Sequence, residues 1–214
     1  MPPPLPVDAD RLPPELVEAI AARGNVRSSP ANAILIHEGD ATDSLYILLS
    51  GRLCVYATGE TGREVVLAEY GPGETLGELS LDGEPRSASV KALEACRCMV
   101  VQGSELRAFM VEHPDYALHL VAKLIRMVRR LTEQVKSLAL QDVYGRVARL
   151  LMEMSDPAGE ERVLRNRLTQ QDIAARVGSS REMVNRVMKE LVTGGYVSLR
   201  DGRHVIHRKL PAAW

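Results

Sequence analysis

Long apolar runs are missing from this chain of 214 residues. A transmembrane helix needs about 18 or more consecutive apolar residues, and no run approaches that length. The proline-rich start at residues 1–4 also lacks the apolar core of a secretory signal peptide. The sequence therefore predicts a cytoplasmic protein that has no membrane partner.

Residue sets that bind metals or carry catalysis are equally scarce. Cys54, Cys96 and Cys98 are an odd number of cysteines without zinc-ribbon spacing, and the five histidines are scattered. Cys96 and Cys98 lie two residues apart on a predicted strand, so they share one face and are interpreted as packing residues. The sequence contains no Ser/His/Asp arrangement, metal-ligand spacing or P-loop, so we predict no metal cofactor and no enzyme.

Charge is nearly balanced over the whole chain but placed unevenly along it. Residues 1–138 contain 14 Lys and Arg against 19 Asp and Glu, a net charge of −5. Residues 139–214 contain 13 Lys and Arg against 9 Asp and Glu, a net charge of +4. A basic C-terminal region fits contact with nucleic-acid phosphates, although so mild an excess also occurs in domains that bind no nucleic acid.

The clearest local pattern in this basic region predicts two short helices joined by a tight turn, over residues 169–189. Thr169 with Asp172 three residues later is a capping-box-like start, and Gly178 supplies the positive φ that a helix end favours. Ser180 then caps the second helix. This order is that of a helix-turn-helix.

The second helix has one apolar face and one polar face. At about 100° per residue, one arc holds the core candidates Met183, Val184, Val187, Met188 and Leu191. On the opposite side, Arg181 and Arg186 can donate to guanine, and Glu182 can accept from cytosine N4. We predict that this face reads double-stranded DNA; the alternative is a solvated face with an Arg/Glu pair. The base-reading and phosphate-contacting candidates together are Thr169, Gln171, Ser180, Arg181, Glu182, Asn185, Arg186 and Lys189.

A hairpin and a further helix complete the C-terminal region. Segments 194–199 and 203–207 flank Asp201-Gly202, which is a strong hairpin signal. Before the helix-turn-helix, Asp142 caps a predicted helix that runs to about Met154, and residues 156–159 break it. These elements together predict a winged helix.

Short strands separated by glycines are predicted in the N-terminal half, after a short helix over residues 13–23. Segments rich in Val, Ile, Leu and Tyr occupy 33–37, 45–49, 53–57, 64–70, 87–93 and 96–101. Many short strands at this spacing favour an antiparallel barrel or jelly roll.

The most regular pattern of the chain follows these strands. An apolar residue recurs at steps of four and three, at Ala117, Val121, Leu124, Val128, Leu131, Val135 and Leu138. Two apolar positions per seven form the narrow stripe of a parallel coiled coil, so we predict a homodimer. The alternative, a long helix lying on the barrel, favours a broader apolar face. A two-fold dimer would present two recognition helices to half-sites about one DNA turn apart, in a pseudo-palindromic operator.

Two segments of the chain carry a resemblance to a known family. Gly77-Glu78-Leu79, followed by Arg86-Ser87-Ala88, resembles a phosphate-binding cassette, and Ser-Arg-Glu-x-Val-x-Arg at 180–186 resembles a recognition helix. Over almost its whole length the chain resembles the catabolite activator protein family of cyclic-AMP receptor regulators (CRP/FNR). The resemblance implies an α+β fold, with an N-terminal cyclic-nucleotide-binding β-roll (jelly roll) at 1–113, a coiled-coil dimerisation helix at 114–140 and a C-terminal winged helix-turn-helix at 141–214. It also implies a half-site like the family's TGTGA and RNA polymerase as a partner.

The chemistry of a cyclic nucleotide suits the residue types of the cassette. Arg86 can grip the single negative charge of a cyclic phosphodiester through two hydrogen bonds, and Ser87 and the Ala88 N–H can add neutral donors. Glu78 can accept from a ribose 2′-hydroxyl, and Gly77 permits close backbone approach. The alternative is a surface ion pair between Glu78 and Arg86. By resemblance, the nucleotide contacts are Leu67, Gly77, Glu78, Leu79, Arg86, Ser87, Ala88 and Thr132.

Two departures from the family pattern bear on specificity. Two adjacent hydroxyl residues on the family's long helix contact the adenine, and Leu131 and Thr132 stand at the matching positions here. Leu131 can neither donate nor accept a hydrogen bond, so the base is not fixed by this pair. Cyclic AMP remains the first prediction, while cyclic GMP, a cyclic dinucleotide and a ligand-independent state stay open. A basic residue often stands in the family where this chain has Gln170, which predicts one weaker DNA-backbone contact.

Relatives of the family can carry other cofactors or serve other functions. The iron–sulfur type uses an N-terminal cysteine cluster that is absent here, and the haem type places Cys and His where this chain has residues 75–81. We therefore expect no haem and no iron–sulfur cluster. A function of another class, as a nucleotide-binding regulatory subunit that docks on an enzyme, would favour an acidic or apolar outward face over the Arg-Glu-Asn-Arg observed.

Overall fold

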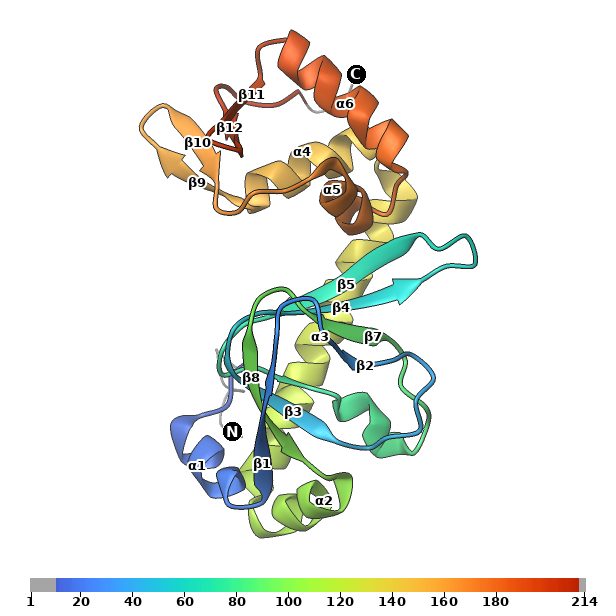
Figure 1. Ribbon diagram of the computed structural model, residues 1–214, viewed down its shortest axis with the longest axis vertical. Coiled ribbons are helices and arrows are strands. Elements are labelled where there is room, and N and C mark those ends of the chain that lie inside the picture. Colours follow the sequence, from blue (N-terminus) through green and yellow to red (C-terminus); the bar gives the residue numbers. More distant parts are fainter. Residues whose placement is uncertain (1–10, 212–214) are drawn as a thin grey trace, which may run out of the picture. The chain divides into compact units, whose positions relative to one another are not determined.

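Two four-stranded sheets account for the strand-rich half of the computed structural model, which describes residues 11–211 (Figure 1). By its internal contacts the chain divides into a first unit, Met1–Ala57 with Val66–Arg130, and a second unit, Thr58–Val65 with Leu131–Trp214. The prediction made for residues 1–4 lies outside the described residues.

The predicted antiparallel β-roll is confirmed. One sheet has the strand order β1 (Gly24–Ser29), β8 (Cys96–Val101), β3 (Leu45–Ser50) and β6 (Thr75–Leu76), and each of its pairs is antiparallel. The other has the order β2 (Ile34–Ile36), β7 (Ser89–Ala92), β4 (Leu53–Thr58) and β5 (Glu64–Tyr70). In β3, Leu45 and Ile47 pack in one apolar cluster and Leu48 in another, because successive strand residues point to opposite faces.

Several elements of the first unit are absent from the sequence prediction. Helix α1 (Pro14–Ala21) was predicted, but β1, β6, the 3-10 helix η1 (Glu78–Asp82) and helix α2 (Gly103–Glu112) were not. Strand β1 shows why, since Gly-Asn-Val-Arg-Ser-Ser has no apolar alternation. Its place comes from a six-residue register against β8, which is a tertiary contact.

Helix α3 (Pro114–Leu140) is the long helix that the heptad pattern predicts. Its buried residues Tyr116, His119, Ala122 and Lys123 belong to the first unit. No helix within residues 11–211 is both long and apolar enough to cross a membrane.

The predicted apolar seam of α3 is largely exposed, but in the N-terminal half of the helix the exposed apolar residues differ from the predicted ones. Val121, Val128, Leu131, Val135 and Leu138 are exposed, each by 44% or more. Ala117 and Leu124 are only half-exposed, because they flank the buried Tyr116 and Lys123. The exposed stripe therefore runs through a slightly different set of residues: Leu118, Val121, Ile125, Val128, Leu131, Val135 and Leu138.

The second unit confirms the predicted winged helix. Helix α4 (Val143–Glu153) begins at the Asp142 cap, which accepts from the Gly145 N–H, and α5 (Gln170–Val177) and α6 (Arg181–Thr193) follow. Strands β11 (Val197–Arg200) and β12 (Arg203–Ile206) form the hairpin. Asp201 at φ 51° and Gly202 at φ 75° have the two positive φ angles that a tight type I′ turn requires.

The helix break predicted at residues 156–159 is confirmed, because α4 ends at Glu153, but the sequence did not predict that a second hairpin of the same sheet begins there. Strands β9 (Ser155–Ala158) and β10 (Glu161–Leu164) pair with each other, and β10 pairs with β12, in the order β11-β12-β10-β9. Pro157 fits because β9 is an edge strand, where a residue without an N–H costs no ladder bond. The Asp-Pro-Ala-Gly sequence thus marks an edge strand and its turn.

The three cysteines are buried and none of them forms a disulfide, which fits packing residues. Burial raises the pKa of the Cys98 thiol to about 11 and also raises that of Cys96. Both therefore stay protonated at neutral pH.

Candidate functional site

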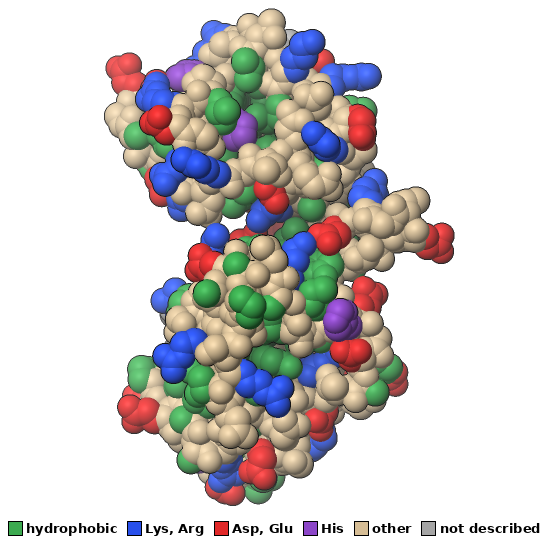
Figure 2. Space-filling model, viewed as in Figure 1, with side chains coloured by type: hydrophobic (Ala, Val, Ile, Leu, Met, Phe, Trp, Pro, Cys, Tyr) green, Lys and Arg blue, Asp and Glu red, His purple; other side chains and the backbone are tan. Residues whose placement is uncertain are grey.

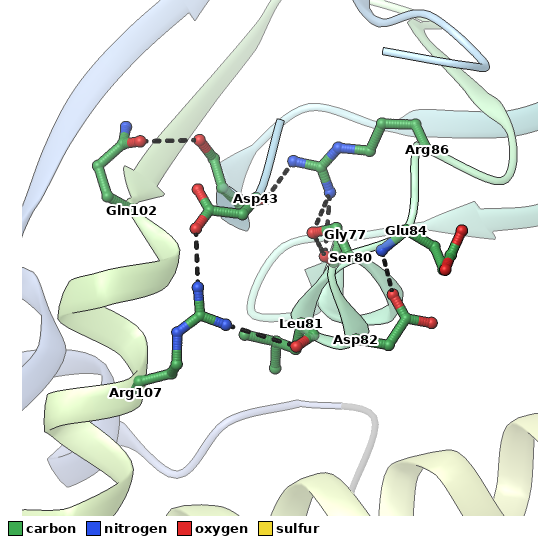
Figure 3. A network of polar contacts seen from close by, with 10 residues as sticks. Asp43, Gly77, Ser80, Leu81, Asp82, Glu84, Arg86, Gln102 and Arg107 are labelled. Atoms are coloured by element: carbon green, nitrogen blue, oxygen red, sulfur yellow. Dashed lines mark hydrogen bonds and ion pairs between the residues drawn. The ribbon is translucent and has the colours of Figure 1, made fainter. Parts of the chain in front are cut away.

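Arg86 is the centre of a polar network in the first unit (Figure 3). Its side chain is buried, with 5% of the residue exposed. Nε donates to Thr42 Oγ1 at 2.9 Å, Nη1 to Gly77 O at 3.0 Å and Ser80 Oγ at 2.9 Å, and Nη2 to Ser44 O at 2.6 Å. All four acceptors are neutral hydroxyl or carbonyl oxygens. The network therefore holds the Arg86 guanidinium in place without a hydrogen bond to a carboxylate.

The charge of Arg86 survives this burial. Desolvation lowers the pKa of the guanidinium, but arginine starts so high that it stays protonated. The four hydrogen bonds use four of its five N–H donors, and one Nη2 hydrogen remains. The two-bond grip on a phosphate predicted from sequence therefore requires exchange of one internal bond, such as that to Ser80.

Gly77 is required by this network. It begins η1 at φ 95°, a left-handed conformation that side chains rarely adopt. A Cβ at this position would lie 2.7 Å from Ser44 O and 2.9 Å from Arg86 Nη1. Gly77 was predicted to let a ligand approach the backbone closely. In this structure the group that approaches Gly77 is the guanidinium of Arg86.

Glu78 does not pair with Arg86, so the predicted alternative of a surface ion pair is wrong. The Glu78 side chain is 3% exposed, and its Oε1 lies 2.9 Å from Lys123 Nζ on α3. The other oxygen, Oε2, is buried and accepts no hydrogen bond from the described residues. One buried carboxylate oxygen therefore keeps its acceptor capacity.

Lys123 is the site residue that sequence reasoning missed. Its ammonium is 1% exposed and also donates to Thr75 Oγ1 at 2.9 Å and to Thr75 O. The Tyr70 ring centroid lies 5.6 Å from Nζ. The helical spacing could have revealed Lys123, because it follows Tyr116 by seven residues and His119 by four. These positions share one face of α3, and that face is buried.

The remaining nucleotide candidates have mixed environments. Leu67 in β5 is half-buried, Ala88 is buried, Leu79 is 49% exposed and Ser87 is exposed. Thr132 is an exposed residue of α3 in the second unit, and its nucleotide contact stays a prediction.

A hollow of about 340 Å³ adjoins the Arg86 network without involving the predicted residues. Thr42, Ser44 and Ser80 hold Arg86 and also line this hollow. Asp43 and Glu84 line it too, and two carboxylates do not suit a phosphate. We assign it no ligand. Its full lining is Ala41, Thr42, Asp43, Ser44, Ser80, Gly83, Glu84 and Gln102.

The helix-turn-helix of the second unit is capped as the sequence predicts. Thr169 and Asp172 form a complete capping box, and Gly178 ends α5 at φ 63°. Ser180 caps α6 by accepting from the Met183 N–H. The Thr169 hydroxyl donates to Asp172 Oδ2 at 2.7 Å, so its predicted phosphate contact requires that bond to exchange.

The polar face of α6 is exposed, whereas one predicted core residue is not buried. Met183 is 38% exposed and lies at the margin of the apolar arc. The four other core candidates are buried: Val184, Val187, Met188 and Leu191. The residues predicted to contact base edges or phosphates on α6 all face solvent: Arg181, Glu182, Asn185, Arg186 and Lys189.

Two polar groups on α6 are held by their neighbours. The Asn185 Oδ1 accepts from Gln170 Nε2 at 3.0 Å, so Gln170 braces α6 and leaves the Asn185 amide hydrogens for a base. Hydrogen bonds from its own main-chain N–H and from Ser180 lower the pKa of the Glu182 carboxyl. Glu182 is therefore ionised at neutral pH and can only accept, as cytosine N4 requires.

Exposed charge is dispersed rather than concentrated on the visible face. Figure 2 shows Lys and Arg side chains interspersed with Asp and Glu, with no single large basic patch. This agrees with the mild net charge of +4 over residues 139–214, whose 13 Lys and Arg face 9 Asp and Glu.

Known proteins match both halves of the chain. A cyclic nucleotide-binding domain model matches residues 26–113, and a Crp-like helix-turn-helix domain model matches residues 145–212. The cAMP-activated global transcriptional regulator CRP of Pasteurella multocida is 33% identical over 192 residues, which cover 86% of this chain and 90% of that protein. The chain belongs to the CRP/FNR family of transcription regulators.

Solved structures of CRP/FNR regulators share the fold. The global regulator CLP of Xanthomonas campestris, described as c-di-GMP responsive, has a TM-score of 0.83 at 25% identity and covers 91% of this chain and 99% of its own. The catabolite activator protein of Thermus thermophilus is 30% identical with a TM-score of 0.55, and covers 92% of each chain. The CRP/FNR recognition made from the cassette and the recognition helix is therefore confirmed.

Proposed function

We propose that this CRP/FNR regulator binds a pseudo-palindromic DNA operator as a homodimer, under the control of cyclic AMP bound at the Arg86 cassette. The observation that carries the proposal is the buried guanidinium of Arg86, whose hydrogen-bond acceptors are all neutral. A buried cation of this kind favours an anionic ligand, because the ligand supplies the missing negative charge. The Pasteurella multocida relative is cAMP-activated, which makes cyclic AMP the first candidate.

A cyclic dinucleotide is the second candidate effector. The Xanthomonas campestris regulator, with a TM-score of 0.83 to this chain, is described as c-di-GMP responsive. Leu131 also lacks the hydroxyl that the family resemblance places against adenine. Both observations favour testing cyclic di-GMP beside cyclic AMP.

The dimer follows from the exposed stripe of α3. Val128 is 61% exposed, Val135 65% and Leu138 52%, at heptad spacing. Apolar side chains repeated in this way are stabilised when they meet the same stripe of a second copy. We therefore assign the stripe to a second copy of this chain.

In the proposed complex, α6 enters the major groove of each half-site. Arg181 and Arg186 donate to guanine and Glu182 accepts from cytosine N4, which gives discrimination of about 1–3 kcal/mol per bidentate base contact. Thr169, Gln171 and Ser180 contact phosphates through short polar groups and main-chain N–H groups. Nucleotide shifts the equilibrium toward the DNA-binding arrangement by its higher affinity for that state, and RNA polymerase is the proposed partner on the promoter.

Calorimetric titration of the full chain tests nucleotide control. Cyclic AMP, cyclic GMP and cyclic di-GMP are titrated into the wild type, Arg86→Gln and the control Arg107→Gln. Arg107 pairs with Asp43 at 3.1 Å beside the same network, but its side chain is 52% exposed (Figure 3). We expect Arg86→Gln to lose about tenfold or more in affinity, and Arg107→Gln to match the wild type.

Thermal unfolding of each variant accompanies the titration, because Arg86→Gln removes the donors to two main-chain carbonyls, Gly77 O and Ser44 O. A folded Arg86→Gln that binds nucleotide as the wild type does would contradict the assignment of Arg86. A wild type that binds none of the three nucleotides would contradict nucleotide control altogether.

A further inference from the structure

The buried pair of Glu78 and Lys123 links the nucleotide cassette to α3. Glu78 opens η1 and Lys123 lies at the middle of α3, 45 positions later, yet the two charged atoms are 2.9 Å apart. Both residues belong to the first unit. Few buried ion pairs persist without further hydrogen bonds, since desolvation of two charges is costly.

Three acceptors surround the ammonium of Lys123. It has three N–H donors, and Glu78 Oε1, Thr75 Oγ1 and Thr75 O supply three acceptors. Thr75 precedes Glu78 by three residues, at β6, so these three acceptors come from one short segment. This geometry holds Oε1 in a single place.

The carboxylate of Glu78 is only half satisfied. Oε1 is taken by Lys123, while Oε2 is buried without a hydrogen-bond donor among residues 11–211. A buried ionised oxygen that lacks a donor is unfavourable, and a hydroxyl-bearing ligand would supply the donor. Glu78 Oε2 is thus a strong acceptor that can bind a ligand donor, and the bond from Lys123 to Oε1 restricts the rotation of its side chain.

We propose that Lys123 is a positioning residue for the cyclic nucleotide, holding Glu78 Oε1 so that Oε2 accepts from the ribose 2′-hydroxyl and tying that contact to α3. The inference rests on the proposed function, because it requires a nucleotide at the cassette. It makes Lys123 a determinant of ribose specificity. A 2′-deoxy ligand would leave Oε2 buried and unpaired, and such a site rejects the ligand that lacks the hydroxyl.

The test compares nucleotides that differ only in the 2′-hydroxyl. Cyclic AMP and cyclic di-GMP, each beside its 2′-deoxy analogue, are titrated calorimetrically into the full chain. The proteins are the wild type, Lys123→Met and the control Lys136→Met. Lys136 lies on the same helix and also pairs with a glutamate, Glu133 at 2.8 Å, but it is 58% exposed.

For the nucleotide that binds, we expect the wild type and Lys136→Met to prefer the ribose form by about tenfold or more, the effect of one hydrogen bond to a charged acceptor. Lys123→Met is expected to lose most of this preference, because Glu78 is no longer held. If Lys123→Met weakens both forms equally and keeps the wild-type ratio, Lys123 is only structural and the inference is overturned. A wild type with no ribose preference also overturns it while leaving nucleotide control intact, whereas a wild type that binds no nucleotide overturns the proposed function and the inference with it.

Lys123→Met leaves a buried carboxylate unpaired and can fail to fold, so a second comparison is included. Glu78→Leu alone is compared with Glu78→Leu combined with Lys123→Met, a pair of variants in which residue 78 has no oxygen for Lys123 to hold and the double substitution buries no charge. If Lys123 acts through Glu78, the added substitution leaves the ribose-to-deoxyribose ratio unchanged. A further fall in that ratio would show that Lys123 acts independently of Glu78 and would overturn the inference.

Discussion

The nucleotide cassette and the recognition helix use charge in opposite ways. In the cassette, Arg86, Glu78 and Lys123 are buried and each is held by other groups of the first unit. On α6, Arg181 and Arg186 are exposed and project away from the core of the second unit. The cassette therefore has charges whose positions are fixed before any ligand arrives, whereas the charges of α6 lie on an exposed surface that we propose contacts DNA.

Burial of a charge decides whether it affects both stability and recognition or recognition alone. A buried charge contributes to folding and to ligand binding at once, so its loss affects both. An exposed charge contributes little to folding and can be altered for recognition alone. Four comparisons test this contrast, and they are given in order of decreasing effect.

Removal of Glu78 should give the largest effect. Glu78→Ala leaves the Lys123 ammonium buried and unpaired, and the free energy of unfolding of the first unit should fall by about 3–5 kcal/mol. Glu182→Ala, which removes an exposed carboxylate from the first turn of α6, should shift the urea unfolding midpoint only slightly. Recovery of stability in the apolar pair Glu78→Leu with Lys123→Met would confirm the cause, and equal stability of Glu78→Ala and Glu182→Ala would contradict the contrast.

Substitution of a glycine should also cost more stability in the cassette than in the helix-turn-helix. Gly77→Ala places a Cβ 2.7 Å from Ser44 O at φ 95°, and should cost about 2–4 kcal/mol from the left-handed conformation and the clash. Gly178→Ala meets only the exposed Leu138 side chain, at 3.0 Å, and should cost about 1–2 kcal/mol. Thermal unfolding checks the order, and a larger loss for Gly178→Ala would reverse it.

Base reading by α6 should change without any change in nucleotide binding. Glu182→Gln replaces a pure acceptor with an amide, and its preference for cytosine at one half-site position should fall about tenfold. Selection from randomised duplexes measures the preference, and calorimetry should show wild-type nucleotide affinity. An unaltered base preference would remove Glu182 from the reading face.

The smallest expected effect is a pH dependence in the sheet of the second unit. Hydrogen bonds from Arg200 and then His207 lower the pKa of Glu161 below its ordinary value of 4.5. A lowered folded-state pKa stabilises the fold above the unfolded-state pKa, and this contribution is lost as the pH falls through the folded-state value. The melting temperature of the wild type should exceed that of Glu161→Gln at pH 6, and the difference should shrink at a second pH well below 4.5. A difference that is the same at both pH values would contradict this assignment.

Local signals in the sequence predict the elements of the second unit well. The Thr169–Asp172 capping box, Gly178 and the Asp201-Gly202 turn each depend on residues a few positions apart, and all are observed. The polar face of α6 follows from the period of a helix. These features could be predicted because their causes lie within a short stretch of chain.

The partners of the buried charges could not be predicted in this way. Glu78 was expected to face a ligand or Arg86, but its partner Lys123 comes from a helix 45 positions later. The acceptors of Arg86 at Thr42 and Ser44 precede it by more than 40 positions. Such pairs depend on how β6, η1 and α3 pack, and no local rule encodes that packing. Strand β1 was missed for the same reason, since its pairing with β8 decides its structure.

Fluorescence anisotropy with a labelled duplex measures whether this chain binds a symmetric operator as a dimer under nucleotide control. The wild type is titrated against a pseudo-palindrome of two TGTGA-like half-sites and against the same duplex with one half-site scrambled, with and without cyclic AMP or cyclic di-GMP, and sedimentation gives the stoichiometry. We expect two chains per symmetric duplex, with nucleotide strengthening that binding and a marked loss of affinity on the scrambled duplex. A single chain bound with equal affinity to both duplexes, whether or not nucleotide is present, would contradict it.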